Sequence, residues 1–134
     1  MIEGQCACGA ITVRVRAIDG TVTNCHCGQC RKQCGGAYLT VVPVNCDDFV
    51  LSDPGNQLAN YRATAAKERA FCSICGGMIY SRRAGSNSVR VRAGLFDDLD
   101  GRKPEVHIFA DSPALWYRSR DQLPRYSATE PGRS

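Results

Sequence analysis

Apolar and polar residues alternate with a period of two along two stretches of the chain. In residues 11–16, and again in 89–93, every second position is apolar and its neighbours are threonine or arginine. This period is typical of β-strands with one buried face. Shorter β-rich runs predict further strands at 39–42, 49–51, 58–63, 68–71, 78–82 and 106–109. The pattern therefore predicts a mainly β fold with tight turns.

Glycine and proline residues divide these runs, and two places favour a short helix. Pro43 follows the run at 39–42 and is expected to break it. One helix is expected over about 28–34, directly after Cys27. The second is expected to start at 111–113, where Asp or Ser can cap a helix and Pro can occupy its first turn.

The length of the chain, 134 residues, is that of one domain. We expect a single domain over 1–126 and a polar, disordered tail over 127–134. No apolar run approaches the roughly 18–20 residues that span a bilayer. The N-terminal residues are too short and polar a stretch for a signal peptide. These features predict a cytoplasmic location and no membrane partner.

Seven of the nine cysteines fall into three tight clusters. An odd number of cysteines without a secretion signal argues against a disulfide framework, so we expect reduced thiols. Cysteines one or two residues apart can hold one small cation, and zinc takes four such ligands at about 2.0–2.3 Å. Two pairs complete one site, whereas a triplet leaves one position free for chemistry. The clusters are Cys6 and Cys8, then Cys25, Cys27 and Cys30, then Cys72 and Cys75.

The two pairs, Cys6 with Cys8 and Cys72 with Cys75, predict a structural zinc that joins the N-terminus to the middle of the chain. Gly76 and Gly77 follow the second pair, and backbone amides in such a turn can point at the sulfurs and offset their charge. In a small domain this metal would supply much of the folding free energy. The alternative is a set of four buried cysteines without metal.

The triplet Cys25, Cys27 and Cys30 predicts a second zinc, and its fourth position decides the function. Water or an incoming thiol there would make the metal a Lewis acid and an activator of thiolate, and a protein ligand would make the site structural. Cys34, four residues after Cys30, and His26, inside the cluster, are the local candidates for that position. Cys34 could also only pack against the helix.

The formal charge of +4 gives little reason to expect a nucleic-acid partner. Seven thiolates (−7) and two zinc ions (+4) together contribute −3, which would leave about +1. The arginines are scattered along the sequence, without the basic run or stripe of a nucleic-acid-binding protein. We expect most of them to lie on a solvated face.

Several motifs together resemble the glutathione-dependent formaldehyde-activating enzyme (GFA) family, also called the CENP-V/GFA domain. The first are GQCACGA at 4–10, CHCGQCR at 25–31 and FCSICGG at 71–77, in which all seven clustered cysteines match in order and spacing. Later matches are AGLFDD at 93–98 and EVHIF at 105–109. The resemblance covers about residues 3–126.

This resemblance implies a zinc-containing β-tent of antiparallel sheets with two zinc ions per chain. The structural zinc would lie on Cys6, Cys8, Cys72 and Cys75, and a labile catalytic zinc on Cys25, Cys27 and Cys30. It also implies a carbon–sulfur lyase reaction that joins glutathione, the small-molecule thiol partner, to formaldehyde.

Two functions therefore stand beside each other at the level of sequence. The first is a zinc enzyme that handles adducts of glutathione, or a similar thiol, with formaldehyde or another small electrophile. The second is a non-catalytic binding module in which both zinc ions are structural. Arg31 and Lys32 could attract the carboxylates of glutathione or only face solvent, and we expect His107 to be a structural histidine and Trp116 to lie in the core.

Overall fold

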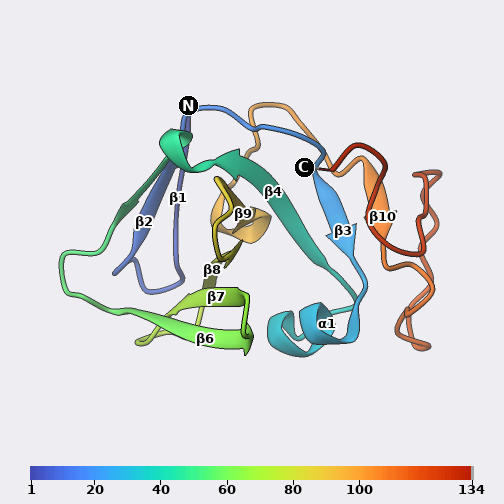
Figure 1. The fold of residues 1–134 in the computed structure, drawn as a ribbon, viewed down its shortest axis with the longest axis horizontal. Helices are drawn as coiled ribbons and strands as arrows, with labels where there is room; N and C mark the ends of the chain where they lie inside the picture. Colours follow the sequence, from blue (N-terminus) through green and yellow to red (C-terminus); the bar gives the residue numbers. More distant parts are fainter. Residues whose placement is uncertain (134) are drawn as a thin grey trace.

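The computed structural model describes residues 1–133, and in this part of the chain ten strands form two sheets (Figure 1). The smaller sheet has the order β1-β2-β5 and is antiparallel. The larger has the order β10-β3-β4-β9-β8-β7-β6, with only β10 and β3 parallel among the described strands. The strands are β1 (Ile2–Gln5), β2 (Thr12–Val15), β3 (Thr23–Cys25), β4 (Leu39–Asn45), β5 (Phe49–Ser52), β6 (Leu58–Thr64), β7 (Lys67–Cys72), β8 (Met78–Arg83), β9 (Ser88–Arg92) and β10 (Val106–Ile108).

The α-helix α1 (Gly28–Cys34) follows β3, and two short 3₁₀ turns are η1 (Cys46–Asp48) and η2 (Ala93–Leu95). The mainly β fold of antiparallel sheets, predicted from the sequence with one or two short helices, is confirmed, and the described residues form one α-helix. In Figure 1 the small sheet lies on the side of the N-terminus, and α1 lies beside the end of the hairpin formed by β6 and β7.

Alternate residues of the strands build the main core between the two sheets. Val13 of β2, Val42 of β4 and Val91 of β9 are buried there, and Val42 and Val91 are paired across their strands. Each valine buried in this way contributes about 1.5–3 kcal/mol to folding. The residues between them point to the other face of the larger sheet, as the period of two requires.

That other face holds the exceptions to one expectation. Most arginines are exposed, as expected, but Arg92 of β9 and Arg69 of β7 are each only 4% exposed. The contact between Arg69 on β7 and Cys30 on α1 shows that the sheet curves around this face. The arginine side chains therefore point into an enclosed space.

Strand β4 runs through Pro43, so the expectation that proline ends it is wrong. The carbonyl of Pro43 accepts a hydrogen bond from the N–H of Asp19, on the side of β4 away from β9. The nitrogen of Pro43 points to the same side, and the pairing with β3 covers only Leu39–Val41. A missing N–H costs nothing where no strand is paired.

Two further expectations fail in the segment after β10. Residues 111–117 form turns instead of a helix, with the N–H of Tyr117 bonded to the carbonyl of Ala114. Trp116 is 73% exposed and not part of the core. The turns bring the chain back so that Asp121 reaches His107, a tertiary contact that the capping pattern does not reveal.

Residues 127–133 have defined contacts where the sequence predicts a disordered tail. The carbonyl of Ala128 accepts from the N–H of Phe109, and Glu130 is buried and paired with Arg133. Ser134, the last residue of the expected tail, lies outside the described residues. The division at residue 126 stays a prediction.

Candidate functional site

The two cysteine pairs meet in one cluster at the edge of the main core. The sulfur of Cys8 lies 3.7 Å from that of Cys6 and 3.7 Å from that of Cys72, and Cys75 completes the group. A metal–sulfur distance of about 2.3 Å in a regular tetrahedron separates the sulfurs by about 3.8 Å. Four soft thiol donors at this spacing fit a zinc ion, as the sequence predicts.

Backbone amides support the sulfurs of this cluster. The N–H of Ile11 lies 3.4 Å from the sulfur of Cys6, and the N–H of Gly77 lies 3.4 Å from that of Cys75. The bond from Gly77, followed by a backbone hydrogen bond from Cys8, lowers the pKa of Cys75 to about 6. A thiol with a lowered pKa is a better metal ligand, because the ligand form is the thiolate.

The other three predicted ligands lie together at the junction of β3 and α1. Cys25 ends β3, Cys27 is the N-cap of α1, and Cys30 lies in the first turn of the helix. Their sulfurs lie within 4.8 Å of one another. The sulfur of Cys27 accepts from the N–H of Cys30 at 3.4 Å, so the cap of the helix also orients a ligand.

The three thiols shift one another's pKa values. Hydrogen bonds from Cys25 and then Cys30 lower the pKa of Cys27 to about 2, and the bonds with Cys27 and Cys30 raise the pKa of Cys25. The thiols thus share protons among crowded sulfurs. A divalent cation would take the place of those protons, so this set of donors also fits zinc.

Neither Cys34 nor His26 belongs to the three-cysteine cluster as the described residues place them. Cys34 is exposed, and its thiol donates to the carbonyl oxygens of Arg31 at 3.7 Å and Tyr38 at 3.5 Å. His26 is buried and points at His107 instead. No fourth protein ligand from residues 1–133 accompanies the three sulfurs.

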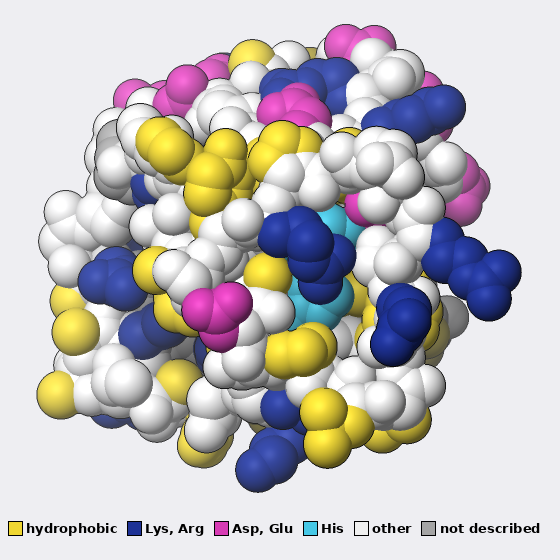
Figure 2. Space-filling model, turned by 90° about the vertical axis from the view of Figure 1, so that its right-hand side faces the viewer, with side chains coloured by type: hydrophobic (Ala, Val, Ile, Leu, Met, Phe, Trp, Pro, Cys, Tyr) yellow, Lys and Arg dark blue, Asp and Glu magenta, His cyan; other side chains and the backbone are white. Residues whose placement is uncertain are grey.

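A chain of polar groups, two buried histidines and the exposed Asp121, holds the loop between the ligands. His26 Nε2 lies 2.7 Å from His107 Nδ1, and His107 Nε2 lies 3.0 Å from both carboxylate oxygens of Asp121. An ionised Asp121 accepts from Nε2–H of His107, which leaves Nδ1 of a neutral His107 to accept from His26. In Figure 2 basic and hydrophobic side chains cover most of the two histidines. Both ring nitrogens of His107 thus have hydrogen-bond partners, which follow only from the tertiary structure. Its structural role stays a prediction.

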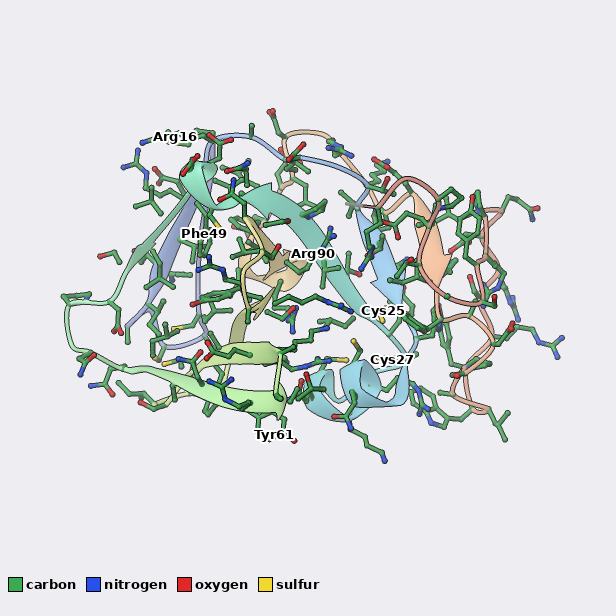
Figure 3. All side chains as sticks on the ribbon, in the orientation of Figure 1. Arg16, Cys25, Cys27, Phe49, Tyr61 and Arg90 are labelled. Carbon is green, nitrogen blue, oxygen red and sulfur yellow. The ribbon has the colours of Figure 1, made fainter. Side chains whose placement is uncertain are left out.

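The three-cysteine cluster opens into a cavity of about 730 Å³ on the curved face of the larger sheet. Figure 3 shows Cys25 and Cys27 beside this face, where β3 meets α1, and Arg90 on the strand β9. Among the described residues that line the cavity, seven are cationic and none is acidic. The cations are Lys67, Arg69, Arg82, Arg83, Arg90, Arg92 and Arg133.

Arg69 and Arg92 are the buried members of this set. Arg69 Nη1 lies 3.8 Å from the sulfur of Cys30. Burial, followed by the charge of Arg69, lowers the pKa of Arg92 to about 10. Sequence reasoning missed both residues, although the alternation of Val and Arg at 89–92 already placed Arg90 and Arg92 on one face of their strand.

Arg31 and Lys32, the cations that the sequence suggested for glutathione, lie outside this lining as far as the described residues show. Arg31 donates from Nε to the carbonyl oxygen of His26 at 3.2 Å, so it supports the loop of ligands from behind. Lys32 is exposed.

Among residues 1–133 no helix is long and apolar enough to cross a lipid bilayer.

Comparisons with known proteins agree with the motifs and the fold. A family model described as glutathione-dependent formaldehyde-activating enzyme matches residues 1–112. An uncharacterized lyase of Schizosaccharomyces pombe is 24% identical, over 85% of this chain and 89% of its own length. A Halomonas elongata protein, provisionally named glutathione-dependent formaldehyde-activating enzyme, is 29% identical, over 91% of this chain and 84% of its own.

A solved structure shares the fold. The crystal structure of a Rhodobacter sphaeroides protein matches with a TM-score of 0.61 and 21% sequence identity. The match covers 77% of this chain and 92% of that protein.

Proposed function

Because the chain belongs to the glutathione-dependent formaldehyde-activating enzyme family, we propose that it is a zinc-dependent carbon–sulfur lyase acting on the adduct of glutathione and formaldehyde. The observation that carries this proposal is the cluster of Cys25, Cys27 and Cys30, which faces a cavity without a fourth protein ligand among the described residues. The names of the two relatives, a lyase and a formaldehyde-activating enzyme, support the same class of reaction.

The residues at and around the three-cysteine cluster would have separate roles in this reaction. Cys25, Cys27 and Cys30 would hold a zinc ion that, when bound, lowers the pKa of an incoming thiol and polarises a small carbonyl group. Arg69 lies close enough to Cys30 to offset part of the negative charge of the thiolates. The chain from His26 to Asp121 keeps the ligand loop in place.

The reaction conserves all atoms. The thiol of glutathione loses its proton to solvent, and its sulfur forms a bond to the carbon of formaldehyde. The electron pair of the C=O bond moves to oxygen, which takes up a proton. The product is S-hydroxymethylglutathione, and the lyase direction breaks the same carbon–sulfur bond. The cavity leaves room for both reactants beside the cysteines.

The non-catalytic binding module requires a closed second metal site. Cys34 was the cysteine expected to close it, and it is exposed with its thiol turned to the backbone. This placement supports the enzyme over the binding module.

Exchange NMR tests the proposal with the zinc-loaded protein, glutathione and ¹³C-formaldehyde at equilibrium. We expect the protein to raise the exchange between free glutathione and its adduct above the spontaneous rate, and Cys27→Ser to abolish that increase. Cys34→Ser is the matched control, because it changes a cysteine of the same helix outside the cluster, and it should keep the increase. Exchange at the spontaneous rate with fully loaded protein would refute the enzyme.

A further inference from the structure

We propose that Arg69 and Arg92 form a binding site for a carboxylate group of the thiol substrate, and that this site selects anionic thiols. The inference rests on the proposed function for the thiol itself. It adds the residues that recognise the carboxylates of that thiol.

Both guanidinium groups are buried with unused donors. Arg92 Nη1 donates to Ser81 Oγ at 3.2 Å and to the carbonyl oxygen of Arg90 at 3.2 Å. Its Nε and Nη2 have no hydrogen-bond partner in the described residues, and neither does Nε of Arg69. Burying an N–H donor without an acceptor costs desolvation free energy. A ligand that accepts hydrogen bonds from these donors therefore binds with a favourable contribution that offsets much of this cost.

Strand register brings the two arginines together around Ser81. Ser81 of β8 is paired with Arg69 of β7 on one side and with Arg90 of β9 on the other. Arg92 reaches the same serine with its side chain. Both arginines line the cavity that contains the three cysteines, so one ligand can touch them and the metal site.

The charge of the cavity favours an anion. The described lining itself has no carboxylate. The carboxylates near its cations are Glu130, which pairs with Arg133, Asp19, whose charge acts on Arg90, and Glu68, which is paired across strands with Arg82. Three thiolates around a zinc ion carry only one net negative charge. No salt bridge involves Arg69 or Arg92 within residues 1–133, so their charges stay uncompensated by carboxylates.

A carboxylate matches these donors better than a neutral group. The planar guanidinium group binds a carboxylate through two parallel hydrogen bonds, and such charge-assisted bonds are about twice as strong as neutral ones. Glutathione has two carboxylates beside its thiol. One of them at Arg69 and Arg92 would hold the sulfur near Cys25, Cys27 and Cys30.

Calorimetry with two ligands tests whether carboxylates matter. S-methylglutathione keeps both carboxylates but has no thiol to ionise, and its dimethyl ester lacks the carboxylates. We expect zinc-loaded protein to bind the diacid at least about tenfold more tightly than the diester, the effect of one charge-assisted hydrogen bond. Equal affinities would overturn the proposal.

Variants assign the effect to the buried arginines. Arg92→Gln should weaken binding of the diacid by at least about tenfold and leave the diester unchanged. Arg82→Gln removes the same charge from the exposed rim of the cavity and should have a smaller effect. Arg16→Gln, far from Cys25 in Figure 3, should have none. A loss with Arg82→Gln as large as with Arg92→Gln would refute the assigned site.

The two proposals fail separately. S-methylglutathione cannot react, so its preference over the diester reports on carboxylate recognition alone, whereas NMR exchange reports on the reaction. A preference without accelerated exchange would leave the carboxylate site standing and refute the enzyme. If Arg92→Gln does not fold, as judged by zinc content and circular dichroism, Arg69→Gln takes its place in the comparison with Arg82→Gln.

Discussion

At the scale of single residues, two backbone segments approach so closely at one glycine that a side chain there would be destabilising. Gly4 of β1 lies directly against η2, and a Cβ at this position would collide with the carbonyl oxygen of Leu95 and come 2.8 Å from a ring carbon of Phe96. The contact joins the strand that precedes Cys6 to the segment after β9. The small sheet therefore depends on the absence of a side chain here.

We expect Gly4→Ala to lower the free energy of unfolding by about 1–3 kcal/mol, the usual effect of overpacking. Urea denaturation followed by far-ultraviolet circular dichroism would measure it. Gly94→Ala is the matched control in η2, because a Cβ there meets no described atom within 4 Å. Equal stabilities of the two variants would contradict the argument.

At the scale of elements, the two ends of α1 hold the metal ligand Cys30 in place. The sulfur of Cys27 caps its first turn, and Gly35 ends it with a φ of 73° and an N–H bonded to the carbonyl of Arg31. A helix of seven residues is too short to be stable alone. Its ends therefore decide how firmly Cys30 is held.

Gly35→Ala places a Cβ on a left-handed residue, which costs about 1–2 kcal/mol. We expect faster loss of zinc from the three-cysteine cluster to a chelator, with the four-cysteine cluster unaffected. Gly36→Ala is the control at the next residue, where the nearest atom is 3.8 Å away and the φ is not left-handed. A chromogenic zinc indicator follows the two release phases, and equal rates for both variants would count against this role of the cap.

At the scale of the whole molecule, the two cysteine clusters have different places in the fold. Cys6, Cys72 and Cys75 pack in the main core and join the N-terminal strands to the larger sheet. Cys25 and Cys30 belong to a second hydrophobic cluster next to the cavity. Metal at the first cluster should therefore support the fold, and metal at the second should serve the cavity.

We expect Cys8→Ser to lower the melting temperature far more than Cys27→Ser, because metal binding at a structural site contributes folding free energy. Elemental analysis should find two zinc ions per chain, falling to one after dialysis against millimolar glutathione. Cys27→Ser should start with one zinc ion and keep it. Two zinc ions that both survive dialysis, or similar melting of the two variants, would argue against this division.

Much of the fold was predictable because local pattern determines local structure. The alternation at 89–93 and the run at 78–82 predicted β9 and β8, and the spacing after Cys27 predicted α1. Strands β1 and β3 were missed, since both are short and lack a clear alternation. The helix at 111–113 was predicted from a capping pattern that the contact of Asp121 with His107 overrides.

The sequence by itself determined the grouping of the cysteines, since ligands within five residues stay close in any fold, and it determined which side chains share a strand face. The sequence also predicted that Cys6 and Cys8 share a site with Cys72 and Cys75. Only the tertiary structure decided that Cys34 stays outside the second cluster and that Arg69 and Arg92 are buried beside it. The physical reason is that alternation separates two faces of a strand, but the curvature of the sheet determines whether the polar face meets water or encloses a cavity.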